Sequence, residues 1–156
     1  MKGNAEVIQI LNEVLTWELT SVNQYFLGSK ICANWGYLRL HAYLRKESID
    51  EMKHADVLIE RVLFLEGLPN VQKLEKIQIA DSVPGQLAAD KQLEDHAIAR
   101  LNKGIARCRE LADVGSAELL EHILVSEEAH LDWIETQLTL IQQIGEAHYL
   151  AQQARE

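Results

Sequence analysis

The chain has 156 residues, of which 47% are hydrophobic, with two prolines, eight glycines and a formal net charge of −9. This length suits one domain with a sizeable core, and the composition favours a mostly helical fold. The acidic balance argues against a nucleic-acid partner because no basic block offsets it, and no stretch approaches the roughly 20 apolar residues that a membrane span needs.

The N-terminus and the cysteines indicate the compartment. The first six residues lack the apolar core of a secretory signal peptide, so we expect a soluble, cytoplasmic protein. Cys32 and Cys108 lie within helical patterns and have no CxxC spacing. We therefore expect buried, reduced thiols rather than a disulfide or a thiolate metal site.

Apolar side chains recur with helical period along the first part of the chain. They predict a helix over about 5–34 and, after a short break at 34–36, a second helix to about residue 66. Gly67 and Pro69 then stop the second helix.

The stretch 67–85 differs from what precedes it, because it holds both prolines and is of mixed polarity. Ile77-Gln78-Ile79 alternates in a way that fits a brief extended segment. At roughly 3.3 Å per extended residue the stretch is long enough to run beside a whole helix of the preceding pair.

Two further helices are predicted over about 85–111 and 117–144. A tight turn at 113–116 joins them, with Asp113 or Ser116 as the N-cap. Gly145 ends the second of these helices, and residues 146–155 are expected to form a short fifth helix. Since Tyr149, Leu150 and Ala151 are apolar, we expect this segment to pack near a subunit junction in a large closed oligomer.

The links between helices determine the fold class. Short links make the helices of each pair antiparallel, and the long link returns the chain across the bundle. The prediction is an all-α single domain over residues 1–156: a four-helix bundle at about 5–144, one long crossover between the second and third helices, and a short C-terminal helix at about 146–155.

Glu51 and His54 form a Glu-x-x-His motif, whose three-residue spacing places both side chains on one helix face. Alone, such a pair could be a surface pair, a core polar pair or two metal ligands. The motif occurs again 76 residues later, at Glu127 and His130. This repetition favours the metal ligands.

Glu18 and Glu94 extend the repeat, since they are also 76 residues apart. Each half of the chain therefore reads Glu and then, 33 residues on, Glu-x-x-His. All four glutamates share stripes with Leu, Ile and Val, which argues against the alternative of a wet face or of pairing with Lys and Arg.

A buried set of four carboxylates needs compensation, because desolvating each anion costs several kcal/mol. Two divalent cations would balance the four negative charges, with two imidazoles completing the ligand set. Carboxylate-rich, sulfur-free ligation suits iron or manganese. Six ligands for two metals leave open coordination positions, as redox chemistry with dioxygen or peroxide requires.

Other polar and soft side chains have weaker signals. We interpret Tyr25 as a core residue rather than one bordering the metals, and a lone methionine such as Met52 is by default core filler, although a thioether can also be an axial haem ligand. Met52 lies about 100° around the helix from Glu51, off the metal stripe. The remaining histidines are expected to be surface or locally bonded polar groups: His41, His96, His122 and His148.

The sequence closely resembles bacterioferritins along essentially its whole length. The resemblance is carried by the opening MKGN, NQYF at 23–26, ESIDEMKHAD at 47–56, LFLEGLPN at 63–70 and EExHxDW at 127–133. The repeated Glu and Glu-x-x-His ligands are the established pattern of ferritin-like di-iron carboxylate bundles. The resemblance therefore implies the ferritin-like four-helix fold.

The family implies a role for each of the six repeated residues. They would form a di-iron ferroxidase centre with two iron ions per subunit, in which Glu51 and Glu127 bridge the irons. The terminal ligands would be Glu18 with His54, and Glu94 with His130.

The family also implies a second cofactor and several partners. Met52 and its copy from a two-fold related subunit would supply both axial ligands of a b-type haem. Twenty-four subunits would enclose a hollow shell in which Fe(II), oxidised by O2 or H2O2, is stored as a hydrated ferric mineral. A small ferredoxin would pass electrons to the haem for iron release.

The sequence departs from some bacterioferritins at two positions near this site. Some members have a His where this chain has Lys46, and that His binds iron on the inner surface together with an Asp at the position of Asp50. Some have a Tyr at the position of Leu58.

The alternatives to an iron-storage ferroxidase are another di-metal enzyme, such as a rubrerythrin-type peroxidase or a dimanganese catalase, and a non-catalytic haem-binding or structural shell protein. A rubrerythrin would usually add a CxxC…CxxC iron domain, which this chain lacks.

Overall fold

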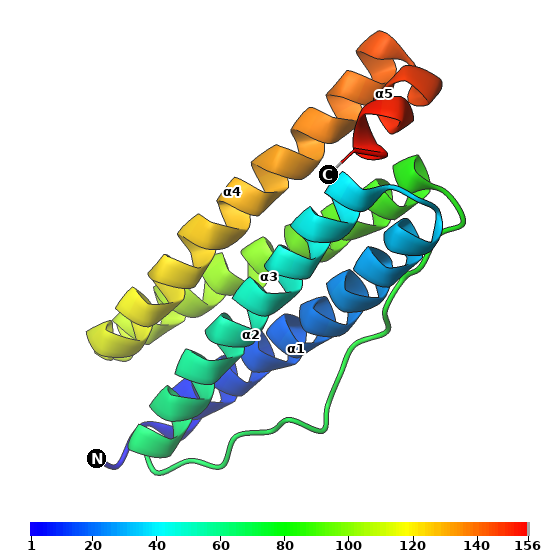
Figure 1. Ribbon diagram of the computed structural model, residues 1–156. Helices are drawn as coiled ribbons and strands as arrows, with labels where there is room; N and C mark the ends of the chain where they lie inside the picture. The colour runs from blue at the N-terminus through cyan, green and yellow to red at the C-terminus, as the bar shows by residue number, and fades with distance from the viewer. Residues whose placement is uncertain (156) are drawn as a thin grey trace.

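The computed structural model describes residues 1–155, and Figure 1 shows their arrangement. The helices are α1 (Ala5–Asn34), α2 (Leu38–Phe64), α3 (Val83–Glu110), α4 (Val114–Ile144) and α5 (Glu146–Gln153). No strand occurs among the described residues. The predicted all-α bundle, with its crossover and its short C-terminal helix, is confirmed.

The four long helices form two antiparallel pairs, α1 with α2 and α3 with α4, as Figure 1 shows. Between α2 and α3, residues 65–82 form neither helix nor strand and run along the outside of the bundle. This connection makes α2 and α3 parallel, so that α1 and α3, and likewise α2 and α4, are antiparallel neighbours.

Two helix starts lie earlier than predicted, and both have a capping explanation. Ser82 caps α3 by accepting a hydrogen bond from the Gly85 amide at 3.1 Å, and Pro84 falls in the first turn, where its missing N–H is not needed. Asp113 caps α4 by accepting from the Ser116 amide at 2.9 Å. At the other end of α4, Gly145 takes a positive φ of 87°, which explains why the helix stops there.

Two apolar clusters fill the bundle, one toward each end. One joins the start of α1 to the end of α2, and includes Leu11, Leu58 and Leu120. The other surrounds the end of α1 and the start of α2, and includes Leu44 and Ile134. The repeated Glu and His residues lie between these clusters along every long helix.

A buried polar network attaches the crossover to the bundle. The Asp90 carboxylate accepts hydrogen bonds from the side-chain amides of Gln24 at 2.8 Å and Gln86 at 2.9 Å. The two glutamine carbonyl oxygens in turn accept from the crossover amides of Gln78 at 3.1 Å and Ala80 at 2.9 Å. Burial raises the pKa of Asp90 to about 6, against the opposing effect of the two amide donors.

The cysteine prediction is confirmed. Cys32 and Cys108 are buried free thiols, and burial raises the pKa of each to about 11. None of the described helices is both long enough and apolar enough to cross a membrane.

In the C-terminal helix α5, Tyr149 finds its packing partner within its own chain. Tyr149 is buried within its own chain, and its hydroxyl donates a hydrogen bond to Gln137 on α4 at 2.7 Å. Its apolar ring is therefore accounted for within the chain and gives no argument for an oligomer. The packing of this segment near a subunit junction stays a prediction.

Candidate metal centre

The repeated Glu and His residues meet at mid-length in the bundle. Each of the four long helices contributes its part of the repeat, and the side chains converge because they lie on the inward stripes of α1 to α4. The convergent residues are Glu18 on α1, Glu51 and His54 on α2, Glu94 on α3, and Glu127 and His130 on α4.

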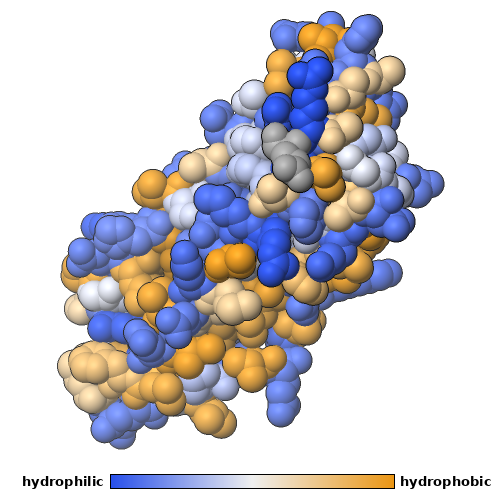
Figure 2. Space-filling model, viewed as in Figure 1, coloured by the Kyte–Doolittle hydropathy of each residue, from blue (hydrophilic) through white to orange (hydrophobic). Residues whose placement is uncertain are grey.

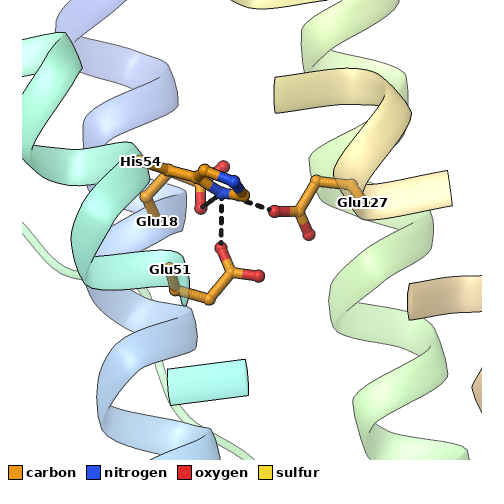
Figure 3. A group of neighbouring side chains, drawn as sticks. All are labelled: Glu18, Glu51, His54 and Glu127. Carbon is orange, nitrogen blue, oxygen red and sulfur yellow. Dashed lines mark hydrogen bonds and ion pairs between the residues drawn. The ribbon is translucent and has the colours of Figure 1, made fainter. Parts of the chain in front are cut away.

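The first half of the centre surrounds His54, as Figure 3 shows. Ligand-type atoms of Glu18, Glu51, His54 and Glu127 all lie within 4.8 Å of one another. The His54 Nδ1 atom is 3.0 Å from Glu127 Oε1, 3.4 Å from Glu18 Oε2 and 3.5 Å from Glu51 Oε2. One ion position can therefore reach three carboxylates and one imidazole.

The second half surrounds His130. Ligand-type atoms of Glu51, Glu94, Glu127 and His130 also lie within 4.8 Å of one another, and His130 Nδ1 is 3.0 Å from Glu94 Oε1. Both halves contain Glu51 and Glu127. The geometry is that of two adjacent cation positions with two shared carboxylates.

Burial leaves this cluster in need of positive charge. The four carboxylates and His130 are almost completely buried. Several of their polar atoms lack a hydrogen-bond partner: Glu18 Oε1, Glu51 Oε2, Glu94 Oε2, both Glu127 oxygens and His130 Nε2. An unpaired buried polar group costs about 1–3 kcal/mol, so carboxylate oxygens in this state fit ligands of hard or borderline divalent cations.

The electrostatics agree with that fit. Burial, followed by repulsion from Glu18 and Glu127, raises the pKa of the Glu51 carboxyl well above its usual range. Burial, followed by the Glu127 charge, does the same to the pKa of Glu94. For His54, burial lowers the pKa, but close contacts with the Glu127 and Glu18 carboxylates outweigh it and raise the pKa to about 10. A cation that binds His54 Nδ1 must therefore displace a proton.

Tyr25 corrects one sequence-based interpretation. Its ring is fully buried, as predicted, but its hydroxyl donates a hydrogen bond to Glu94 Oε1. The interpretation of Tyr25 as a core residue that does not border the site is therefore wrong. The ring also lies edge-on to the His130 imidazole, with ring centroids 4.9 Å apart.

Glu47 is a site residue that the sequence reasoning missed. It is only 8% exposed, and its Oε2 lies 3.6 Å from His130 Nδ1. Burial raises the pKa of its carboxyl. One available signal was its spacing of four residues from Glu51, which places it on the same helix face.

Met52 lies apart from this cluster. Its side chain is 57% exposed on α2, which agrees with the predicted orientation away from Glu51 and does not fit a core filler. Haem ligation by Met52 stays a prediction. The neighbouring Lys46 ammonium lies 3.0 Å from Asp50 Oδ2 and pairs with it, and Leu58 is fully buried in the apolar core.

The other histidines lie outside the centre, as predicted. His41 Nδ1 lies 2.8 Å from the Ser29 carbonyl, and His96 packs against Trp17 with ring centroids 5.4 Å apart. His122 and His148 are exposed.

Known proteins share these features. A family model described as a ferritin-like domain matches residues 8–144. The chain is 47% identical over 152 residues to a bacterioferritin of Mycobacterium bovis, covering 97% of this chain and 96% of the relative. It is 48% identical over 151 residues to one of Streptomyces coelicolor, covering 97% and 90% respectively. For one of Brucella melitensis the identity is 44% over 149 residues, with 96% and 92% covered.

Proposed function

The chain belongs to the bacterioferritin family, and we propose that it stores and detoxifies iron by acting as a ferroxidase. The observation that carries the proposal is the pair of four-residue donor groups that share Glu51 and Glu127. Two Fe(II) ions would bind as substrate in these groups and be oxidised to Fe(III) by O2 or H2O2. The ferric product would be deposited as a mineral inside a hollow shell.

The donor groups suggest a role for each ligand. Glu51 and Glu127 belong to both groups, so their carboxylates suit bridging positions. Glu18 with His54, and Glu94 with His130, each belong to one group only and suit terminal positions. Two neighbouring Fe(II) ions can supply together the two electrons that reduce O2 to H2O2, or H2O2 to water.

The chain's own groups prepare the site for this chemistry. Tyr25 donates a hydrogen bond to Glu94 and so orients one terminal carboxylate. His54 carries the proton that the incoming cation must displace. The surrounding apolar clusters exclude water from the carboxylates, which strengthens their attraction for a divalent ion.

The remaining components follow from the family. Met52 would face a two-fold related subunit and bind a b-type haem together with the partner copy of the same residue. Such a haem supplies electron transfer, because two thioether ligands leave its iron no open position. We expect the shell to be a cytoplasmic homo-oligomer of twenty-four such single-domain chains, with a small ferredoxin as electron donor for iron release.

The test is to count oxygen consumed per Fe(II) added to the metal-free protein, and then to look for a mineral core. Wild-type protein should bind two Fe(II) per subunit without oxygen and oxidise them rapidly once O2 or H2O2 is added. Glu94→Ala should slow this phase by more than about tenfold, since even outer partners of metal ligands typically have effects of that size. Asp95→Ala, at the exposed neighbouring position, is the matched control. Rapid oxidation that is equal in both variants would show that the cluster is not the ferroxidase centre.

A further inference from the structure

The two halves of the centre differ in access to the surface. The side chain of His54 is 16% exposed, whereas that of His130 is 2% exposed. The sequence repeat makes these residues equivalent, since they are 76 positions apart. The difference must therefore come from the residues around them.

A groove between α2 and α4 borders His54. Its volume is about 510 Å³, and its walls include Val57 on α2 and Gly115, Leu119 and His122 on α4. Figure 1 shows the face on which α2 and α4 lie side by side, and Figure 2 shows apolar residues gathered on this face over the end of α2 and the start of α4. The groove therefore leads from the surface to one imidazole of the centre.

On the other side, a groove of about 460 Å³ is lined by Tyr43 and Trp133, but His130 is not part of its lining. The repeat matches Val57 with Trp133 and Leu119 with Tyr43, which are again 76 positions apart. The rings of Tyr43 and Trp133 stack, with centroids 3.6 Å apart and planes inclined by 12°. Their centroids lie 5.8 Å and 6.3 Å from that of His130. Two large aromatic rings thus occupy the space that two aliphatic side chains leave open at His54.

Charge does not distinguish the two sides. On the closed side, the Lys46 ammonium is paired with the carboxylates of Asp50 at 3.0 Å and Glu47 at 3.8 Å. On the open side, the Lys53 ammonium borders the groove and lies 3.9 Å from the Asp50 carboxylate, and His122 Nε2 lies 4.0 Å from Glu118 Oε1. The two sides therefore differ in the size of the side chains that fill them.

We propose that divalent cations enter and leave the centre through the groove beside His54, and that the stacked Tyr43 and Trp133 rings close the equivalent route beside His130. The inference rests on the proposed function, because it assigns a path to the ions that the centre oxidises. The unpaired carboxylates behind His54 attract the cation inward, and the imidazole edge is the last group that it passes.

The test moves the aromatic closure from one side to the other. Val57→Trp combined with Leu119→Tyr reproduces the stacked pair in the open groove, and Tyr43→Leu combined with Trp133→Val removes it from the closed side. The probe is Co(II), whose binding to the metal-free protein is followed by stopped-flow absorption and therefore needs no oxidation. Ile144→Trp, at an exposed position at the far end of α4, is the control.

We expect the transplanted pair to slow Co(II) entry several-fold while the amount bound and the final spectrum stay as in wild type. Removing the native pair should open the second route and speed entry, and an unchanged rate in that variant would show that the rings do not close it. If the double variant does not assemble, Val57→Trp alone serves, because Val57 is already 38% exposed. Equal entry rates in the plugged variant, the control and wild type would overturn the groove as the route. Failure of wild-type protein to bind Co(II) at the six residues would instead overturn the proposed centre.

Discussion

Replacing Glu127 by Leu should stabilise the metal-free protein and destabilise the metal-loaded one. Both carboxylate oxygens of Glu127 are buried without a hydrogen-bond partner, and Oε1 lies 3.0 Å from His54 Nδ1 without hydrogen-bond alignment. Leucine has a similar volume and no charge. The exchange removes one of three carboxylates that face the single His54 imidazole and leaves Glu18 to accept from it at 3.4 Å.

The magnitudes determine the sign in each state. Removing an unpaired buried polar group is worth about 1–3 kcal/mol, and the exchange also relieves Glu51 and Glu94 of repulsion by the Glu127 charge. For a chain of this size we therefore expect the Tm of the metal-free protein to rise by roughly 5 °C. In wild type, each ion bound at a hundredfold excess over its Kd adds about 2.7 kcal/mol. Because Glu127 belongs to both donor groups, the variant loses both contributions, which together exceed its gain.

The assay is calorimetric unfolding of wild type, Glu127→Leu and Glu128→Leu, each with chelator and with Zn(II) or Co(II). The neighbouring Glu128 is exposed, so its exchange for Leu should leave both the metal-free Tm and the metal-induced rise unchanged. The order of stability of wild type and Glu127→Leu should reverse when metal is added. A Glu127→Leu protein that is less stable without metal, or that keeps the full metal-induced rise, would refute the reasoning.

Three further predictions concern residues outside the ligand set. Burial raises the pKa of Asp90 from 3.8 to about 6, so the folded state holds this proton more tightly than the unfolded state. The stability of the metal-free protein should therefore fall by at most about 3 kcal/mol as the pH rises between these two values. Asp90→Asn should remove this part of the pH dependence. Unfolding curves with the same pH dependence in both proteins would contradict this. Met52→Leu should keep the shell and Fe(II) oxidation but lack haem absorbance and release stored iron more slowly to a reductant; a full haem complement would rule out Met52 as the axial ligand. Tyr25→Phe should lower the stability of the metal-free protein by about 0.5–1.5 kcal/mol, since the hydroxyl donates to the Glu94 carboxyl, whose raised pKa favours the neutral form. An unchanged denaturation midpoint would show that this hydrogen bond adds no net stability.

Features that depend on local periodicity were predictable from the sequence. The helical repeat of apolar residues predicted each long helix, and the break at 34–36 and Gly145 predicted where α1 and α4 end. The 76-residue repeat also predicted which residues would converge, because helices of similar length in antiparallel pairs bring equivalent positions to the same level. The start of α3 was missed by two residues because Pro84 was assigned to the loop, although a first-turn proline is compatible with a helix.

Features that depend on side-chain reach between helices were not predictable. Tyr25 lies two turns from Glu18 on α1, and only the distance to α3 decides that its hydroxyl meets Glu94. Glu47 has an apolar counterpart in the repeat, Ile123, so the pattern that identified the ligands could not identify it. In both cases the helical period predicts the face on which the side chain lies, but the packing of the helices determines which residue it contacts.

The same departures from the repeat bear on how iron would move. If the two halves of the chain were identical, both halves of the centre would be equally accessible. The repeat instead matches Val57 with Trp133 and Leu119 with Tyr43. The Lys46 ammonium is paired with Asp50 at 3.0 Å, so this carboxylate is already neutralised and attracts a cation only weakly. A route that needs a cation site at Lys46 and Asp50 is therefore unfavourable. The groove beside His54 does not depend on that position, so loss of a metal-binding side chain there need not isolate the centre.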